Sequence, residues 1–358
     1  MLIGVNHLAK TNKLYQSVLQ ELKSEITGGK YPLNSKLPTE EELSKSFNIS
    51  RSTLRKVLQE LKEDGFIEST KGSGSFIRNK NIIRYIPVII SGDDTNYRKT
   101  EILKGIQDYF NKVDFSSLPT FMDYSREKEA KLILELIGQG HKNFIVYPLA
   151  SDSNPEFYQK MIQQGINFVF VDTLPDKITC DYVASCNYLG GYMATKKLIE
   201  LGHKRIAFCS FLNLERVNTI KERFSGYLDA LAQSGIDCPK DLIFIEEDLS
   251  NEELATKILN NCSNATAVFS ASDELAFFII NKLPSMNMKL ALCGFDNSLI
   301  APSVRLASIN QNFYEIGKNA AKLMYERILN PGKYYEHIYI PVSMFERDSL
   351  ISADQVCY

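Results

Sequence analysis

The chain has 358 residues, of which 44% are hydrophobic and 23% are charged, and its formal net charge is -2. This length suits two or three domains with cores of their own, and the near-neutral charge excludes a uniformly basic nucleic-acid-binding protein. No apolar run approaches the roughly 18 residues that a membrane span needs, and the first residues lack the basic and apolar regions of a signal peptide.

Cysteine usage and charge distribution point to a compartment and to a division of the chain. The 7 cysteines are dispersed, without a C-x-x-C pair and without ligand-like spacing to the 4 histidines. Such a set is typical of reduced thiols in a cytoplasmic protein, so we expect no metal site and no cofactor. Residues 1–80 carry 13 Lys and Arg against 9 Asp and Glu, and this basic excess favours a DNA-binding head on an acidic body.

The first part of the chain reads as three helices followed by a hairpin. Residues 13–27 repeat apolar side chains at helical spacing. Thr39–Glu42 forms a capping box for a second helix, and Ser50 can cap a third one after a short turn. Alternating strands then flank a Gly-rich tip within residues 66–77. Two short helices joined by a turn and followed by such a wing predict a winged helix-turn-helix.

Polar side chains at the beginning of the third helix are the expected DNA contacts. Exposed N–H groups at a helix N-terminus favour phosphate, and Arg can bind phosphate or the edge of a guanine. A lysine beside glycines at the wing tip can approach a minor groove closely. The predicted DNA-binding residues are Thr39, Ser50, Arg51, Ser52, Thr53, Arg55, Lys71 and Gly72. The alternative is an ordinary helical hairpin with a solvated charged face.

The stretches LPTEEEL, ISRSTLRKVLQELKEDGFI and KGSGSFI resemble the core motif of the GntR family of bacterial transcription regulators. The resemblance implies recognition-helix roles for Arg51, Ser52, Thr53 and Arg55 and a wing tip at Lys71-Gly72. Glu41 departs from the motif, because many members have Arg at that position. The operator preference of a relative therefore does not transfer to this chain.

After a polar joint at residues 79–84, apolar strands alternate with helices. Continuous apolar runs such as FVFVD and AVFSA are typical of parallel strands buried on both faces. In chain order the pattern predicts strands that begin at residues 85, 121, 143, 168, 206, 243, 267 and 290, and helices at 100–112, 127–139, 155–164, 189–201, 221–234 and 251–260. This alternation predicts an α/β, doubly wound fold. We expect a winged helix-turn-helix at 1–78, a linker at 79–84 and a two-lobed effector domain at 85–358.

Polar side chains at or near the carboxyl ends of these strands predict a ligand crevice. Carboxylates accept hydrogen bonds from adjacent hydroxyls and Arg donates two, so the set suits a polyhydroxylated ligand. The expected effector contacts are Asp172, Arg223, Ser272, Asp273, Asp296 and Gln311. Alternatively, a strand-end Asp merely caps the helix that follows. Since the chain has no Trp, the candidates for a stacking platform are Tyr97, Tyr124 and Phe295.

The segments GYMATKKLIELGHKRIAF, RFSGYLDAL, SASDELAF, LCGFDNS and RLASINQNFYEIGKNAAKLM resemble the effector domain of the LacI family, which shares the periplasmic sugar-binding fold. The resemblance implies effector contacts for Asp172, Arg223 and Asp296 and a cleft-lining role for Gln311. Ser272 stands where the family often has Asn. Joined to a GntR head, this body resembles the arabinose-repressor subgroup.

The resemblance implies a repressor of carbohydrate-utilisation genes that responds to a monosaccharide. A homodimer on a pseudo-palindromic operator, with helices 100–112 and 314–329 at the interface, is expected, and the ligand is expected to favour release from DNA. The same architecture could sense a nucleobase or a sugar phosphate, use its ligand as a corepressor, or activate transcription. A pure binding protein is a further alternative. We expect no enzyme, because the sequence offers no Ser-His-Asp order, metal cluster or phosphate loop.

Overall fold

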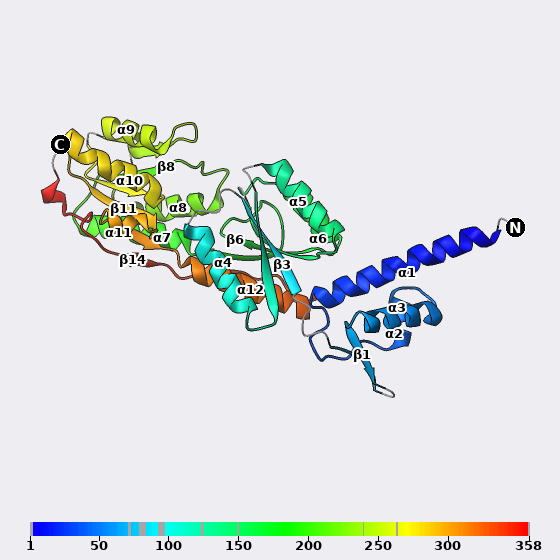
Figure 1. The fold of residues 1–358 in the computed structure, drawn as a ribbon. Helices are drawn as coiled ribbons and strands as arrows, with labels where there is room; N and C mark the ends of the chain where they lie inside the picture. The colour runs from blue at the N-terminus through cyan, green and yellow to red at the C-terminus, as the bar shows by residue number, and fades with distance from the viewer. Residues whose placement is uncertain are drawn as a thin grey trace.

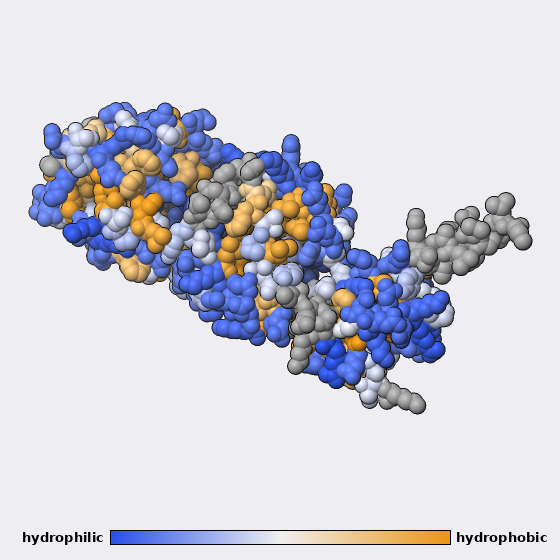
Figure 2. Space-filling model, in the orientation of Figure 1, coloured by the Kyte–Doolittle hydropathy of each residue, from blue (hydrophilic) through white to orange (hydrophobic). Residues whose placement is uncertain are grey.

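The computed structural model describes residues 3–70, 73–78, 84–91, 97–122, 125–148, 150–238, 240–262 and 264–356. Figure 1 shows a small amino-terminal head, a middle lobe and a far lobe that holds the carboxyl end. In Figure 2 the visible face of the head is mainly hydrophilic, whereas apolar surface gathers on both lobes. Lys71, Gly72, Tyr124 and most of the predicted linker lie outside the described residues.

The head consists of three helices and a two-stranded antiparallel sheet: α1 (Ile3–Thr27), α2 (Glu40–Ser46), α3 (Arg51–Glu63), β1 (Ile67–Thr70) and β2 (Gly74–Ile77). The predicted capping box of α2 is present, and the Ser50 hydroxyl caps α3 by accepting from the backbone N–H of Thr53. Leu54, Val57 and Leu61 of α3 are buried in one apolar cluster with the inner face of α1. Helix α1 begins ten residues earlier than predicted.

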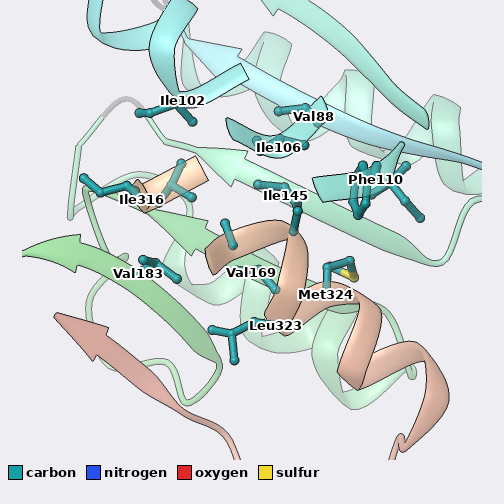
Figure 3. Packing of buried hydrophobic residues seen from close by; sticks show 14 of the residues in the cluster. Val88, Ile102, Ile106, Phe110, Ile145, Val169, Val183, Ile316, Leu323 and Met324 are labelled. Carbon is teal, nitrogen blue, oxygen red and sulfur yellow. The ribbon is translucent and has the colours of Figure 1, made fainter. Parts of the chain in front are cut away.

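Lobe 1, the middle lobe, is a six-stranded parallel sheet in the order β13-β7-β6-β5-β3-β4. Its elements are β3 (Arg84–Ser91), α4 (Tyr97–Phe110), β4 (Phe115–Met122), α5 (Arg126–Gly138), β5 (Asn143–Tyr147), α6 (Pro155–Gln163), β6 (Asn167–Val171), β7 (Asp181–Ser185), α12 (Phe313–Leu329) and β13 (His337–Ile340). Figure 3 shows α4 and α12 turning apolar side chains, among them Ile106, Phe110 and Met324, toward Val88, Ile145 and Val169 of the sheet. Burial of these side chains stabilises the packing of the two helices on one face of the sheet.

Lobe 2 repeats the architecture with the strand order β14-β12-β11-β10-β8-β9, in which only β14 is antiparallel to its neighbour among the strand pairs described. Its elements are α7 (Asn187–Glu200), β8 (Ile206–Ser210), α8 (Asn218–Gln233), β9 (Ile243–Ile245), α9 (Asn251–Asn261), β10 (Ala267–Ser270), α10 (Asp273–Lys282), β11 (Ala291–Asp296), α11 (Ile300–Ser303), β12 (Ala307–Asn310) and β14 (Ser343–Phe345). Short 3-10 turns occupy Lys240–Leu242, Leu283–Met286 and Ala353–Gln355.

Two expectations about these strands were wrong. The strand expected to begin at residue 121 is β4, which begins at Phe115. Its first half contains Ser116 and Ser117 and its second half begins with Pro119, so it lacks the apolar run that marks a buried strand, and it lies at the sheet edge. The alternation of strands and helices is also broken, because β6 leads to β7 without a helix between them.

The chain crosses between the lobes three times, at residues 185–187, 310–313 and 340–343. Hydrogen bonds tie the crossings together. The backbone N–H of Cys186 donates to the carbonyl of Ile340 at 2.9 Å, and the Ser185 hydroxyl donates to the carbonyl of Gln311 at 2.7 Å. Three linked crossings form a hinge that restricts how the lobes can move.

The head contacts lobe 1 through the end of α1. The Ser24 hydroxyl donates to the carbonyl of Gly140, and Glu21 pairs with Lys142 at 3.6 Å. A cavity of about 680 Å³ lies between the two parts. Among the described residues, none of the helices has the length and apolar character to cross a membrane.

Candidate functional site

The beginning of α3 presents a polar surface. The hydroxyl of Ser50 lies 2.8 Å from the hydroxyls of both Ser52 and Thr53. The side chains of Arg51 and Arg55 remain 61% and 70% exposed. These five predicted residues therefore lie together on one exposed helix end.

The predicted capping box and a set of ion pairs that was not expected both affect this surface. The hydroxyl of Thr39 is engaged by the capping box, where it donates to the Glu42 carboxylate at 2.8 Å. In addition, each arginine pairs with a carboxylate of α2. Arg51 lies 2.9 Å from Glu41, and Arg55 lies 2.9 Å from Glu40. The run of three glutamates at residues 40–42 was the available sequence signal for these ion pairs. The capping box already explained the acidic run, so the pairing was not inferred.

Between the lobes, Asp172 lies on the lobe 1 side of a buried, charged boundary, which we call the cleft. It follows β6 and has a φ of 62°, in the left-handed region where a short polar residue is tolerated. Tyr147, at the end of β5, donates its hydroxyl to one carboxylate oxygen of Asp172 at 2.9 Å. The other oxygen is buried and has no hydrogen-bond partner. A buried acceptor without a donor is a position where a ligand hydroxyl could bind.

Arg223 faces Asp172 from lobe 2. It lies in the second turn of α8 rather than at its beginning. The guanidinium donates to the side chain of Asn187 at 2.8 Å and to the carbonyl of Ala271 at 2.7 Å. Its carbon lies 3.9 Å from the centre of the Phe295 ring. Because Phe295 is fully buried under this arginine, it supports Arg223 and is not a platform for a ligand.

Asp296 and Gln311 connect the cleft to the hinge. Asp296 ends β11 and lies 3.8 Å from Arg223. The side-chain amide of Gln311 donates to the same carboxylate, while its carbonyl oxygen is buried without a partner. Gln311 belongs to the second crossing, so a ligand bound to it would contact the hinge directly.

Arg98 is the cleft residue that sequence reasoning missed. It lies in the first turn of α4 and reaches across from lobe 1 to lobe 2, 3.5 Å from Asp296 and 3.7 Å from Glu274. The run YRKTE resembles an ordinary polar helix beginning. The available signal was that the helix follows β3, whose carboxyl end faces the cleft.

Ser272 and Asp273 make other contacts. The Ser272 hydroxyl caps α10 by accepting from the backbone N–H of Leu275. The Asp273 carboxylate accepts from the hydroxyl of Ser308 at 2.6 Å and from the backbone N–H of Ser298 at 2.7 Å. These bonds stay within lobe 2, and the residue that caps α10 is Ser272 rather than Asp273.

Burial and charge oppose each other in the cleft. Burial raises the pKa of Asp172, although Arg223 and Arg98 act against this. Burial likewise lowers the pKa of Arg223, against the attraction of Asp296 and Asp172. For Arg98 the neighbouring carboxylates, Asp296 first, outweigh burial and leave its pKa above the usual range. Burial and the nearby Asp296 raise the pKa of Asp273 to about 7.

The lobes also touch outside the charged cluster. The backbone N–H of Ser151 in lobe 1 donates to the carbonyl of Arg216 at 2.9 Å. The backbone N–H of Asn218 in lobe 2 donates to the Ser151 hydroxyl at 3.0 Å. The cleft is therefore bridged by Arg98 and by this Ser151 contact. Within the described part of the chain, no group of three or more His, Cys, Asp or Glu side chains is arranged to hold a metal.

Known proteins match both parts. Residues 14–77 match the family of bacterial regulatory proteins called gntR, and residues 195–350 match the periplasmic binding protein-like domain. The arabinose metabolism transcriptional repressor of Halalkalibacterium halodurans is 26% identical over 332 residues, which cover 87% of this chain and 88% of the relative.

Solved structures agree with this architecture. The transcriptional regulator CelR in complex with cellobiose has a TM-score of 0.67 and 21% identity, and the match covers 87% of this chain and all of that one. A LacI family regulator from Enterococcus faecium with bound ribose has a TM-score of 0.62 and 26% identity, covering 74% and 98% of the two chains. The chain thus joins a head that matches the gntR family to a body that matches the periplasmic binding protein-like domain, and over most of its length it is similar to transcription regulators.

Proposed function

We propose that the protein is a transcriptional repressor of carbohydrate-utilisation genes whose affinity for its operator changes when a sugar binds between the two lobes. The observation that carries the proposal is the cleft, where side chains from both lobes meet at the hinge. Two oxygens there, one of Asp172 and one of Gln311, are buried without partners. They are acceptors for hydroxyl groups, and Arg223 adds donors. Relatives named as an arabinose repressor and as a ribose-bound regulator support the same ligand class.

A neutral sugar fits the charges better than a sugar phosphate. Arg98 and Arg223 are balanced within the cleft by Asp172, Asp296 and Glu274. A phosphate would have to compete with carboxylates for both guanidinium groups, and it would approach an excess of negative charge. A nucleobase would need an apolar stacking surface, and the buried Phe295 does not offer one.

A thermal-shift screen of pentoses, hexoses and sugar phosphates on the full chain tests the effector. A sugar that binds the folded state raises the unfolding temperature by mass action. Arg223→Ala should erase this shift, whereas Arg305→Ala, an exposed arginine of lobe 2, should keep it. If no sugar shifts the wild-type protein, the sugar hypothesis fails.

DNA binding by the head is tested separately. Arg51→Ala and Arg55→Ala should abolish retention of operator DNA in a gel, because both remove a cation from the exposed end of α3. Lys62→Ala, in the last turn of α3, is the matched control and should bind with little change. Unchanged DNA binding and salt dependence in both arginine variants would contradict the assigned role of the head.

We further propose a homodimer, with α4 and α12 as the first candidates for its interface. Two heads on one two-fold axis can read a pseudo-palindromic site and bind it far more tightly than one head. Sugar binding is proposed to favour the form that binds DNA poorly, since a ligand shifts an equilibrium only by its differential affinity for two states. Sedimentation of the protein, with and without sugar and operator, tests both points. Tighter DNA binding with sugar would indicate corepression instead.

A further inference from the structure

Glu41 contacts two cations of the DNA-binding surface. One carboxylate oxygen lies 2.9 Å from an Nη2 of Arg51, and the other lies 3.0 Å from the Nζ of Lys45. Glu41 is 54% exposed, so these contacts form in water on the face that carries the beginning of α3. The carboxylate therefore occupies the position that a phosphate oxygen would take beside Arg51.

The geometry leaves Arg51 able to read a base. A guanidinium has five N–H donors, and Glu41 engages it through one nitrogen. The remaining edge can still donate two parallel bonds to the O6 and N7 of a guanine, which are neutral acceptors. Phosphate is different, because its charge competes with the Glu41 carboxylate for the same cation and is repelled by it.

We propose that Glu41 is a specificity-determining residue that directs Arg51 to guanine edges by disfavouring its binding to phosphate. This inference rests on the proposed DNA-binding role of the head. Non-specific binding depends on phosphate contacts and counterion release, so Glu41 weakens binding to arbitrary DNA more than binding to the operator. Lys45 lies beside the other oxygen of this carboxylate.

The test compares Glu41→Gln with Glu63→Gln in the full chain. Both changes remove one negative charge from the head, but Glu63 is the last residue of α3, at the end opposite to Arg51. Binding to a mixed-sequence DNA duplex is measured by fluorescence anisotropy at several salt concentrations. Glu41→Gln should bind this duplex several-fold more tightly than Glu63→Gln, and its salt slope should steepen by about 0.9 per head.

A selection from a random duplex pool measures base preference directly. Glu41→Gln should recover sequences with a weaker guanine preference at one position of each half-site, whereas Glu63→Gln should recover the wild-type motif. Neither change touches the capping box, which uses Thr39 and Glu42, and equal unfolding temperatures verify that both variants fold.

The outcomes separate this inference from the function on which it rests. If wild-type protein binds DNA but the two variants agree in salt slope and in selected motif, Glu41 has no role in specificity. If Glu41→Gln instead loses affinity for all DNA, Glu41 contacts a base or orients Arg51, and the proposed discrimination is wrong. If wild-type protein binds no duplex, the assigned role of the head fails, and this inference fails with it.

Discussion

Arg98 and Arg223 approach Asp296 from opposite lobes, and this shared carboxylate is the centre of the cleft. A buried charge is tolerated only when partners compensate it, so removal of one member leaves the others in an unfavourable state. The arrangement makes the cleft sensitive to single substitutions, and it ties the lobes together through charge rather than through apolar contact.

The first prediction concerns Arg98, the arginine that bridges the lobes. Arg98→Ala removes a charged donor and leaves Asp296 and Glu274 less compensated, so sugar affinity should fall by about 10- to 100-fold, the equivalent of about 1.5–3 kcal/mol for bonds to charged groups. Titration calorimetry with the sugar found in the thermal-shift screen measures the loss. Arg305→Ala, which changes an exposed arginine of lobe 2, should retain wild-type affinity. If both variants bind the sugar with equal affinity, Arg98 does not contribute to sugar binding.

A second prediction follows from Asp273, whose pKa is raised to about 7 in the folded protein. The unfolded value is about 3.9, so between these values the folded state holds the proton more tightly. Its contribution therefore decreases the free energy of unfolding as pH rises from about 4 to about 7. Urea unfolding at several pH values should give a shallower decline for Asp273→Asn than for the wild type. Parallel curves for the two proteins would contradict the raised pKa.

At the scale of elements, each lobe is built around two helices that cross closely. In lobe 1, a methyl group on Gly317 of α12 would overlap the backbone of Ile102 in α4. In lobe 2, Gly191 of α7 lies against the backbone of Arg223 in α8. The packing of α7 against α8 also affects the site, because the close approach of α7 fixes the position from which Arg223 enters the cleft.

Gly317→Ala is therefore expected to destabilise lobe 1. The added methyl group forces α4 and α12 apart, and overpacking of this kind costs about 1–3 kcal/mol. Gly138→Ala is the matched control: Gly138 ends α5 and has open space around its Cα. That change should be neutral or slightly stabilising. Denaturant unfolding compares the two, and an equal effect would mean that the helix crossing adapts without cost.

Comparison of the predicted and observed elements shows how much of the structure could be predicted from the sequence. The strand Asn143–Tyr147 and the caps of α2 and α3 were predicted, because apolar runs and capping residues act locally. Asp172, Asp296 and Gln311 were foreseen because they lie at the ends of strands, which meet at one edge of a parallel sheet, whereas Arg223 reaches the site from the second turn of α8. Arg98 and the Glu41–Arg51 pair were not foreseen, since they depend on how separate elements face each other.

At the scale of the whole molecule, the lobes meet at a linked hinge and at the Ser151 contact. The charged cluster lies at the same boundary. We expect an equilibrium between a closed and an open form that depends on these few polar contacts, so the two populations should respond to small changes at this boundary.

Ser151→Ala should shift that balance toward the open form. The change removes both the acceptor for the N–H of Asn218 and the donor to its side-chain carbonyl, and loss of each hydrogen bond is worth about 1 kcal/mol. Apparent sugar affinity should fall about 5- to 30-fold, since 1.4 kcal/mol is a factor of ten. Ser285→Ala, an exposed serine in lobe 2, should have no effect. Calorimetry that gives equal affinities would exclude the Ser151 contact from closure.

The docking of α1 on lobe 1 has a consequence for engineered sensors. Gly29 has a φ of 86°, and a methyl group there would overlap the ring of Phe115 and approach Ile328. A chimera that joins this head to a foreign body within residues 79–83 keeps Gly29 but replaces both of those neighbours. Transplanted heads should therefore transmit the ligand signal only if the graft also carries the lobe 1 surface formed by Phe115, Gly140, Lys142 and Ile328.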